Sequence, residues 1–469
     1  MKQRVKRGSG YNWRFLTLSV WRTLMFRRII LAVILTASCL AQDKVPNASI
    51  ARMEQIVQAY VPGKFMGTVL VAQDGKILLD KAYGFANLEW EVPNTPTTKF
   101  RLGSITKQFT AASILLLEER GKLKVEDPVK KYMPDAPAAW DKITIFHVLT
   151  HTSGIPSLTS FPDFESHEAQ AMTPEKLVEW FRDKPLEFEP GTKWNYSNSG
   201  YILLGYLIEK ISGQSYSDFV QQNIFTPLGM KDSGYDSNST IIAHRAAGYT
   251  PGKSSPVNAG FVHMSIPFSA GALYSTTEDL LRWEQGLFGG KVLKAESLAK
   301  MTTPFKQDYA FGLAVSTNNG HKMIAHDGGI EGFNTALAYY PDDKLVVAVL
   351  ANLNGPAGQI AGNLAKVAHG EKVVLPTERK EITVSPEILK QYVGTYELTP
   401  KFSLAITLED GQLVSQGTNQ GKAPIFAESE TMFFLKLVDA QIEFVKNEKG
   451  QVTNLVLHQN GRDVKGVKK

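Results

Sequence analysis

Ser104 and Lys107 are the first residues whose types and spacing could carry out covalent chemistry. They stand three positions apart in Ser104-Ile-Thr-Lys107, directly before a long apolar run. A serine hydroxyl is a weak nucleophile until a base takes its proton. On a helix, side chains three residues apart share one face, and a partly desolvated lysine has a lowered pKa that lets it accept this proton. If Ser104 lies at a helix N-terminus, backbone N–H groups there also favour developing negative charge.

The same spacing occurs a second time, in Ser297-Leu-Ala-Lys300. That segment is typical of an exposed amphipathic helix, where lysine is simply solvated. The residues after Lys107 are almost all apolar, so a lysine at the mouth of a buried helix needs another reason. The first pair is therefore the candidate nucleophile and base.

A second candidate is Tyr196-Ser-Asn198, which follows the turn signal Pro190-Gly191 and precedes an apolar stretch. A phenol near an ammonium group can have a lowered pKa and pass a proton between nucleophile and leaving group. The amide of Asn198 can orient a substrate. Taken alone, the pattern also fits a loop before a helix, with Ser197 or Asn198 as the N-cap.

A third candidate is His326-Asp-Gly328-Gly329, after a strand-like run. Consecutive glycines allow a substrate backbone to lie close to a strand edge, and a backbone N–H there could complete an oxyanion hole. The alternative is an ordinary turn at the end of a strand.

Other patterns argue against competing chemistries. The pair His147 and His151 has the i, i+4 spacing of a zinc site but lacks a glutamate in the metalloprotease position and a third ligand. We expect a short helix capped by Thr144 instead. A Gly-x-Ser-x-Gly nucleophile elbow is absent, and the single cysteine excludes an intramolecular disulfide or a thiolate metal site. No metal or organic cofactor is expected.

The elements that must position these residues form a recognisable order. Residues 67–85 predict a hairpin around Asp74-Gly75, and 104–120 predict a buried helix ended by Gly121. The remaining signals are helices at 174–182, 199–212, 215–223 and 276–287, the last with a capping box Ser275-x-x-Glu278, and strands at 309–317, 322–326, 333–340 and 344–351. Strands at both ends with helices between them predict one sheet that carries a helical insertion.

The C-terminal part of the chain has a different sequence pattern. Residues 371–385 form a polar, proline-containing linker. Short alternating strands and tight turns follow in 386–469, with turn signals at Glu409-Asp-Gly411, Lys449-Gly450 and Asn460-Gly461. We expect a separate all-β domain, a small barrel or meander. It could cover the active site, bind a ligand or mediate assembly.

Composition and charge indicate a globular protein. Hydrophobic residues make up 43% of the 469 residues and charged residues 21%, which excludes wholesale disorder. Residues 1–42 carry eight basic residues and no acid, more than the whole net charge of +5. The rest is slightly acidic, which argues against nucleic-acid binding.

The N-terminal segment is typical of a secretory signal. Arg27-Arg28 precedes an apolar run that is too short to span a membrane and ends in small residues. We expect residues 1–41 to be this leader, with cleavage after Ala41 and a start at Met25. The alternative is lipidation of Cys39, which would attach the protein to a membrane. Both place it in the periplasm or outside the cell.

In their order along the chain, Ser104-x-x-Lys107, Tyr196-x-Asn198 and His326-x-Gly328 resemble the serine β-lactamase and penicillin-binding-protein superfamily. The branch that they resemble includes class C β-lactamases, D-alanyl-D-alanine carboxypeptidases, D-aminopeptidases and esterases. Further segments match, among them Ile143–Gly154 and Pro190–Tyr201. The resemblance implies an α/β fold with a mixed sheet flanked by helices and a helical subdomain over 50–370. The C-terminal region is similar to lipocalin-like domains attached to some members.

The resemblance also implies roles for residues. Ser104 would be acylated, Lys107 would accept its proton and Tyr196 would relay protons. Asn198, His326 and Gly328 would bind substrate, and the N–H groups of Ser104 and Gly329 would form the oxyanion hole. Histidine at position 326 departs from the lysine of many β-lactamases, so a permanent positive charge for a substrate carboxylate is in doubt.

These observations predict a serine hydrolase that acts through an acyl-enzyme on small-molecule or peptide substrates. A peptidase-type activity, on a D-Ala carboxypeptidase or aminopeptidase pattern, is favoured over an esterase or a β-lactamase. An alternative of another class is a sensor or scaffold that recognises penicillin and acylates slowly. The sequence does not indicate an oligomeric state.

Overall fold

The structure is a computed structural model that describes residues 47–469 except 62, 376–377, 401, 437–439 and 460–461. The expected leader, with Cys39 and Ala41, lies outside the described residues. In the described part, no helix combines the length and the apolar character that a membrane span requires.

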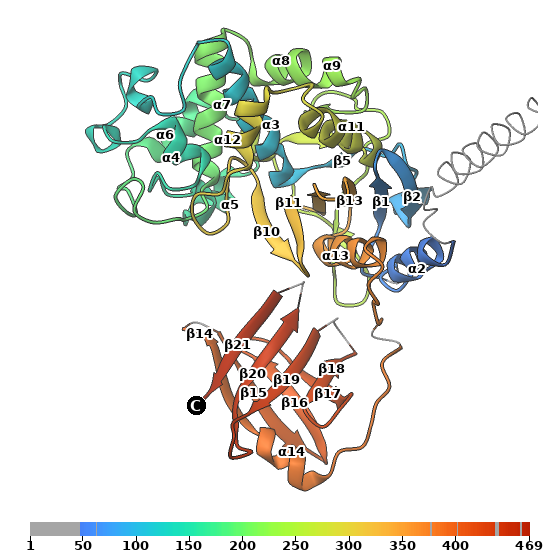
Figure 1. The fold of residues 1–469 in the computed structure, drawn as a ribbon. Helices are drawn as coiled ribbons and strands as arrows, with labels where there is room; N and C mark the ends of the chain where they lie inside the picture. The colour runs from blue at the N-terminus through green and yellow to red at the C-terminus, as the bar shows by residue number, and fades with distance from the viewer. Residues whose placement is uncertain (1–46, 62, 376–377, 401, 437–439, 460–461) are drawn as a thin grey trace, which may run out of the picture. The chain divides into compact units, whose positions relative to one another are not determined.

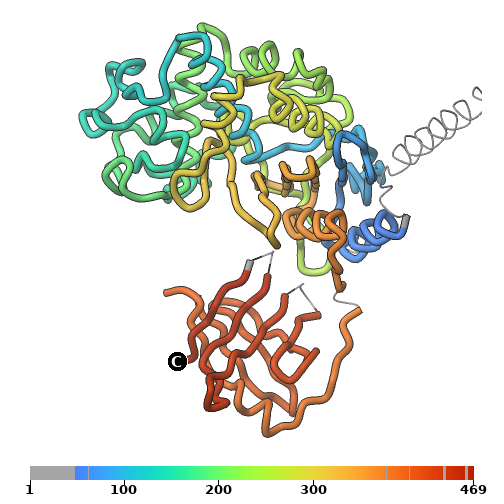
Figure 2. The backbone as a smooth tube through the Cα atoms, viewed as in Figure 1, coloured from blue at the N-terminus to red at the C-terminus, as the bar shows by residue number. Residues whose placement is uncertain are grey.

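Six antiparallel strands form the central sheet, and they come from both ends of the first domain (Figure 1). In spatial order they are β10 (Ala314–Asn318), β11 (His321–Ile330), β12 (Phe333–Tyr340), β13 (Leu345–Ala351), β1 (Gly67–Gln73) and β2 (Lys76–Tyr83). The join is the β13–β1 ladder, where Val349 lies opposite Val69. Figure 2 shows the early blue strands and the late orange ones side by side. The prediction of one sheet built from both ends is confirmed.

The two central strands are buried along their length because helices cover both faces of the sheet. On one face pack α2 (Asn47–Gln58) and α13 (Ala357–Ala368), whose apolar residues form one core with alternate residues of β1 and β13. The other face packs against the helical insertion and forms a second, larger core.

The insertion between β2 and β10 is mostly helical, as predicted. Its α-helices are α3 (Thr106–Glu119), α4 (Ile145–Leu149), α5 (Phe164–His167), α6 (Pro174–Arg182), α7 (Asn198–Ser212), α8 (Tyr216–Val220), α9 (Thr226–Leu228), α10 (Phe268–Gly271), α11 (Thr277–Phe288) and α12 (Ala295–Thr302). Its short strands are β3 (Phe85–Asn87), β4 (Val92–Pro93), β5 (Phe100–Arg101), β6 (Gly234–Tyr235), β7 (Tyr249–Thr250), β8 (Val257–Asn258) and β9 (Leu273–Ser275).

Several predicted boundaries were wrong, for local reasons. Helix α11 is capped by Thr276, whose side chain accepts from Asp279 N. The predicted Ser275/Glu278 capping box does not form, because Ser275 still belongs to β9. The strand predicted from residue 309 begins at Ala314, after a turn. Strand β11 continues through the glycines to Ile330, so the motif of His326 does not lie in a turn.

The C-terminal domain is a closed barrel of eight antiparallel strands. Its strands are β14 (Gly394–Thr399), β15 (Phe402–Glu409), β16 (Gln412–Gly417), β17 (Lys422–Ala427), β18 (Met432–Leu435), β19 (Ala440–Lys446), β20 (Val452–Gln459) and β21 (Arg462–Lys468), preceded by α14 (Pro386–Tyr392). The predicted turn at Asp410-Gly411 forms with positive φ at both residues, +48° and +80°. The barrel has its own core, in which Tyr392 stacks on Phe444 at 4.2 Å between ring centroids.

Candidate active site

Lys107 lies on the first turn of α3 with its side chain fully buried. Its Nζ atom lies 2.9 Å from Ser104 Oγ, 2.9 Å from Asn198 Oδ1 and 2.8 Å from the carbonyl oxygen of Ala270. Ser104 sits one turn earlier, in the 3₁₀ turn η1 (Gly103–Ile105) that leads into α3. The predicted helix over 104–120 therefore begins at Thr106, and the expected Ser104–Lys107 contact forms across the junction.

The three neighbours of Lys107 Nζ suit a neutral amine. Two of them, the Asn198 amide oxygen and the Ala270 carbonyl, can only accept hydrogen bonds, whereas the Ser104 hydroxyl can also donate. A neutral amine donates twice and keeps one lone pair, which then accepts from Ser104. Burial without a carboxylate partner lowers the pKa of Lys107 well below its ordinary value. The ring faces of Tyr196 and Tyr201, 4.9 and 5.6 Å from Nζ, oppose this shift only in part.

Tyr196 lies beside this pair, as predicted, in the loop before α7. It hydrogen-bonds with Ser104, but burial raises its pKa and outweighs that bond. The expectation that a neighbouring ammonium group lowers the phenol pKa was therefore wrong, because Lys107 itself is driven towards its neutral form. Tyr196 keeps its proton near neutral pH.

Asn198 is the first residue of α7, and Ser197 is the N-cap, accepting from Gly200 N at 3.2 Å. The Asn198 side chain accepts from Lys107 through Oδ1 and donates to Thr159 Oγ1 at 3.3 Å through Nδ2. It thus orients the base. Its predicted contact with substrate stays a prediction.

Gly328 and Gly329 of β11 allow η1, the turn that carries Ser104, to pack against the strand. A Cβ atom on Gly328 would lie 2.0 Å from the carbonyl oxygen of Leu102, and one on Gly103 would lie 2.9 Å from Gly329 N. Thr335, from the neighbouring strand, donates to the same Leu102 oxygen at 2.7 Å. The backbones of Gly103 and Gly329 therefore lie close together, and the predicted oxyanion hole requires such an approach next to Ser104.

His326 is buried next to this group, and both of its ring nitrogens have protein partners. Nδ1 donates to the carbonyl oxygen of Asp327 at 2.6 Å, and Nε2 accepts from the Tyr309 hydroxyl at 3.0 Å. Burial lowers its pKa to about 4. His326 is neutral at pH 7 and gives the site no positive charge.

Two residues of this group escaped the sequence analysis. Tyr309 comes from the loop after α12 and carries no motif. His151 was considered only as half of a zinc pair, yet its ring centroid lies 4.3 Å from that of Tyr196. Its place in the segment Ile143–Gly154 was the one available signal.

The rejected patterns have structural roles. Thr144 caps α4, which ends at Leu149, so His151 is not on the helix that carries His147. In the second serine–lysine pair, Lys300 forms an ion pair with Glu118 at 3.0 Å and Ser297 is buried.

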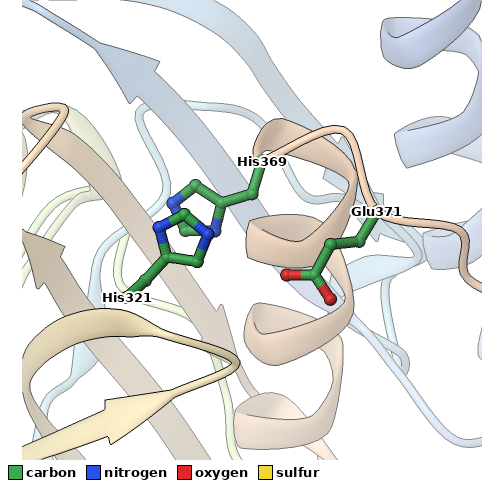
Figure 3. A group of neighbouring side chains, drawn as sticks. All are labelled: His321, His369 and Glu371. Carbon is green, nitrogen blue, oxygen red and sulfur yellow. The ribbon is translucent and has the colours of Figure 1, made fainter.

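One group of described side chains contains metal-binding types, namely His321, His369 and Glu371 (Figure 3). The two imidazole rings are stacked, with centroids 3.7 Å apart and planes 1° apart. Lone pairs lie in the ring planes, so the two rings direct them in parallel and not towards one ion. Glu371 accepts from Asn319 Nδ2 at 2.7 Å. The group lies at the end of β11 away from Gly328 and Gly329.

Comparison with known families gives two matches. Residues 53–370 match the family described as Beta-lactamase, and residues 378–468 match a domain of unknown function. These matches cover the region of the six-stranded sheet and the barrel in turn.

The relatives of this chain cover between about two thirds and nine tenths of it. The chain is 30% identical over 436 residues to penicillin-binding protein 4* of Bacillus subtilis, an alignment that covers 86% of this chain and 95% of that protein. The octameric penicillin-binding protein homologue from Pyrococcus abyssi is 27% identical, with a TM-score of 0.64, over 89% of this chain and all of that one. A D-stereospecific amidohydrolase from a Streptomyces species is 27% identical, with a TM-score of 0.57, over 68% of this chain and 98% of that one.

Proposed function

The chain belongs to the β-lactamase family and is a serine hydrolase of the β-lactamase and transpeptidase group; on this premise we propose that it hydrolyses amide bonds through an acyl-enzyme on Ser104. The substrates would be small peptides or amino-acid amides. The observation that carries the proposal is the set of three oxygen atoms around Lys107 Nζ, with no carboxylate among the hydrogen-bond partners described for that atom. This set of oxygen atoms favours the neutral amine and directs its lone pair towards Ser104 Oγ.

The steps follow from these positions. Lys107 Nζ takes the proton of Ser104 Oγ while the oxygen attacks the substrate carbonyl carbon, and the carbonyl oxygen becomes an oxyanion near the N–H groups of Ser104 and Gly329. The proton then passes through the Tyr196 hydroxyl to the leaving amine as the C–N bond breaks. Water attacks the resulting ester by the same route in reverse, which releases the acid and restores the serine hydroxyl.

We base the substrate class on three acids whose carboxylates influence one another, of which Glu331 lies in the turn that follows β11. Glu168 is a partly buried residue whose pKa is raised by burial and by the carboxylates of Glu331 and Glu165. Glu331 follows Gly329 by two residues and lines a cavity together with Arg101. Since His326 is neutral, we propose that these acids bind the free amine of an amino-acid amide or peptide. The relative from Streptomyces, a D-stereospecific amidohydrolase, agrees with this substrate class.

A cavity next to the nucleophile's turn could receive the substrate side chain. It has a volume of about 210 Å³ and is lined by Arg101, Glu331 and Phe333, among others. Both arginines of its lining, Arg101 and Arg245, already bind the buried Asp236, so they offer little free charge to a substrate carboxylate.

The test is hydrolysis of D-alanine p-nitroanilide by the leaderless protein, compared with its N-acetylated form and with benzylpenicillin. We expect turnover of the free amine, slower turnover of the acetylated amide, and a mass adduct on Ser104 with penicillin. Ser104→Ala should lose all three while unfolding at the same temperature. Wild-type rates in Ser104→Ala would refute the mechanism.

The other outcomes select the alternatives. Rapid hydrolysis of free penicillin would indicate a β-lactamase, and turnover of p-nitrophenyl esters alone would indicate an esterase. A lasting adduct without turnover of any substrate would indicate a sensor or scaffold.

We further propose that the protein is exported, from the basic and apolar pattern of residues 1–41. Fractionation of cells that express the full chain tests this. Release into the periplasm or medium is expected after cleavage at Ala41, whereas membrane retention that is lost in Cys39→Ser would indicate lipidation.

A further inference from the structure

His151 combines burial with an unfavourable backbone conformation. Its exposed fraction is 1%, and its φ is +56°. Left-handed backbone is costly for a residue with a side chain, and residues held there concentrate at functional sites. It stands two residues after the end of α4, next to the loop that carries Tyr196.

This one residue accepts hydrogen bonds from both neighbours of Tyr196. Its carbonyl oxygen accepts from Asn195 N at 3.0 Å, and its Nδ1 accepts from Ser197 N at 3.1 Å. Its ring packs on the Tyr196 ring, with centroids 4.3 Å apart and planes inclined at 41°. The backbone before and after Tyr196 is therefore fixed to the same residue that supports its ring.

The bond to Ser197 also determines where the proton of His151 lies. Because Nδ1 accepts, the hydrogen of the neutral ring is on Nε2, and Nε2 is buried without a hydrogen-bond partner among the described atoms. Burial lowers the pKa of His151 well below its ordinary value, so the ring is neutral. An apolar residue would avoid the unpaired N–H, so in structural terms alone the buried Nε2–H makes histidine a costly choice.

We propose that His151 is the positioning residue that holds the Tyr196 hydroxyl against Ser104 and Lys107. The inference rests on the proposed function, because it assigns His151 a task within that site. It separates two roles in the loop before α7: Ser197 and Asn198 begin the helix and orient Lys107, whereas His151 fixes Tyr196.

Substitutions at position 151 can separate the hydrogen bond from the ring. Asparagine places Oδ1 where Nδ1 lies and tolerates positive φ. Leucine removes the acceptor and strains the backbone, and glutamine carries its polar atoms farther out, leaving Ser197 N without its partner. We expect His151→Leu and His151→Gln to lower kcat on D-alanine p-nitroanilide about 10²-fold, with KM within about threefold of wild type. His151→Asn should recover at least about tenfold of this loss.

The matched control is His147→Gln on the neighbouring helix, which should leave kcat unchanged. Thermal unfolding of each variant shows whether it is folded at the assay temperature. If folded His151→Leu keeps wild-type kcat, or if Leu and Asn lose the same activity, the proposal is wrong.

Amide hydrogen exchange of residues 195–200 tests the inference apart from activity. We expect exchange in this segment to be at least about tenfold faster in His151→Leu than in wild type, and close to wild type in His151→Asn. Unchanged protection in His151→Leu overturns the positioning role whatever the enzyme does. Faster exchange in a protein whose wild type hydrolyses nothing would refute the proposed function and leave the inference on the loop standing.

Discussion

Lys107 is the residue on which the proposed chemistry depends, and the environment of its amine determines whether that amine is protonated. It is buried among one hydroxyl and two acceptor oxygens, and its pKa is lowered by burial. The sequence predicted the pair with Ser104 from spacing, because i, i+3 contacts are local. It could not predict the Ala270 carbonyl as a partner, because that contact joins segments 163 residues apart.

The lowered pKa of Lys107 predicts how acylation depends on pH. The rate of Ser104 labelling by a fluorophosphonate should rise with pH and reach a plateau well below pH 10.5, since the neutral amine is the active form. The raised pKa of Tyr196 predicts no fall of the rate on the alkaline side up to about pH 10. Mass spectrometry of the labelled protein over time measures both.

Lys107→Arg is the control for this profile, because arginine keeps the charge and cannot act as a base. It should lower the labelling rate roughly 10²–10⁴-fold and remove the rising limb. A wild-type midpoint near the ordinary lysine value would contradict the assignment of Lys107 as a neutral base.

His326 predicts a specific loss of stability in acid. Its pKa is about 4 in the folded protein, below the ordinary value of 6.5. Between these values the unfolded chain binds the proton and the folded one does not, so the free energy of unfolding falls as pH decreases from 6.5 to 4 and is unaffected by His326 above 6.5. The contribution is roughly 2–3 kcal/mol at pH 4.5.

Urea unfolding at pH 7.5 and pH 4.5 measures this effect as a difference between proteins. His326→Gln should lose less stability than wild type over this interval, by that amount, while the titration of surface carboxylates cancels in the comparison. Equal losses would mean that His326 is protonated in the folded protein.

At the scale of elements, the docking of η1 on β11 decides where Ser104 lies. The sequence predicted that the glycines of His326-Asp-Gly-Gly allow a backbone to come close, and it assigned that backbone to a substrate. At Gly328 the approaching backbone is that of Leu102, two residues before Ser104, whose carbonyl oxygen lies against Gly328. Periodicity shows that an element exists but not which distant turn packs on it, and the same limit explains why the expected capping box was placed one residue early.

This docking predicts different effects for two neighbouring glycines. Gly328→Ala brings Cβ to 2.0 Å from Leu102 O, so η1 must move away; we expect a loss of roughly 1–3 kcal/mol in the free energy of unfolding and about 10²-fold or more in kcat. Gly329→Ala meets only the side-chain amide of Asn334, at 3.3 Å, and should cost less than about 1 kcal/mol. Denaturant unfolding and steady-state kinetics of the two variants test this. Equal losses of stability and of kcat in the two variants would show that close packing of η1 on Gly328 does not determine the effect of the substitution.

At the scale of the whole molecule, the chain builds two structures with separate cores, an open six-stranded sheet covered by helices and a closed barrel. The sheet joins β1 and β13, whose hydrogen-bonded residues are far apart in sequence, and this join followed from the order of strand and helix signals. The strand and turn pattern predicted only a small barrel or meander, because alternating strands with tight turns do not determine strand number or closure. The expectation of a lipocalin-like barrel came from the family resemblance.

The separate cores predict that the two parts fold independently. The barrel core draws its residues from Val384 onward, and the cores of the sheet draw theirs from residues up to Leu375. Fragments 47–378 and 379–469 keep the ion pairs Arg52–Glu378 and Arg379–Glu428, each within one fragment. We expect each fragment to unfold cooperatively when made alone, since a closed barrel has no free edge and neither core is cut.

Circular dichroism during heating measures this, and fluorophosphonate labelling of the first fragment should proceed within about threefold of the full chain. A drop of more than tenfold in labelling, with the fragment still folded, would mean that the barrel contributes to the active site; a change in solution mass would instead mean that it mediates assembly.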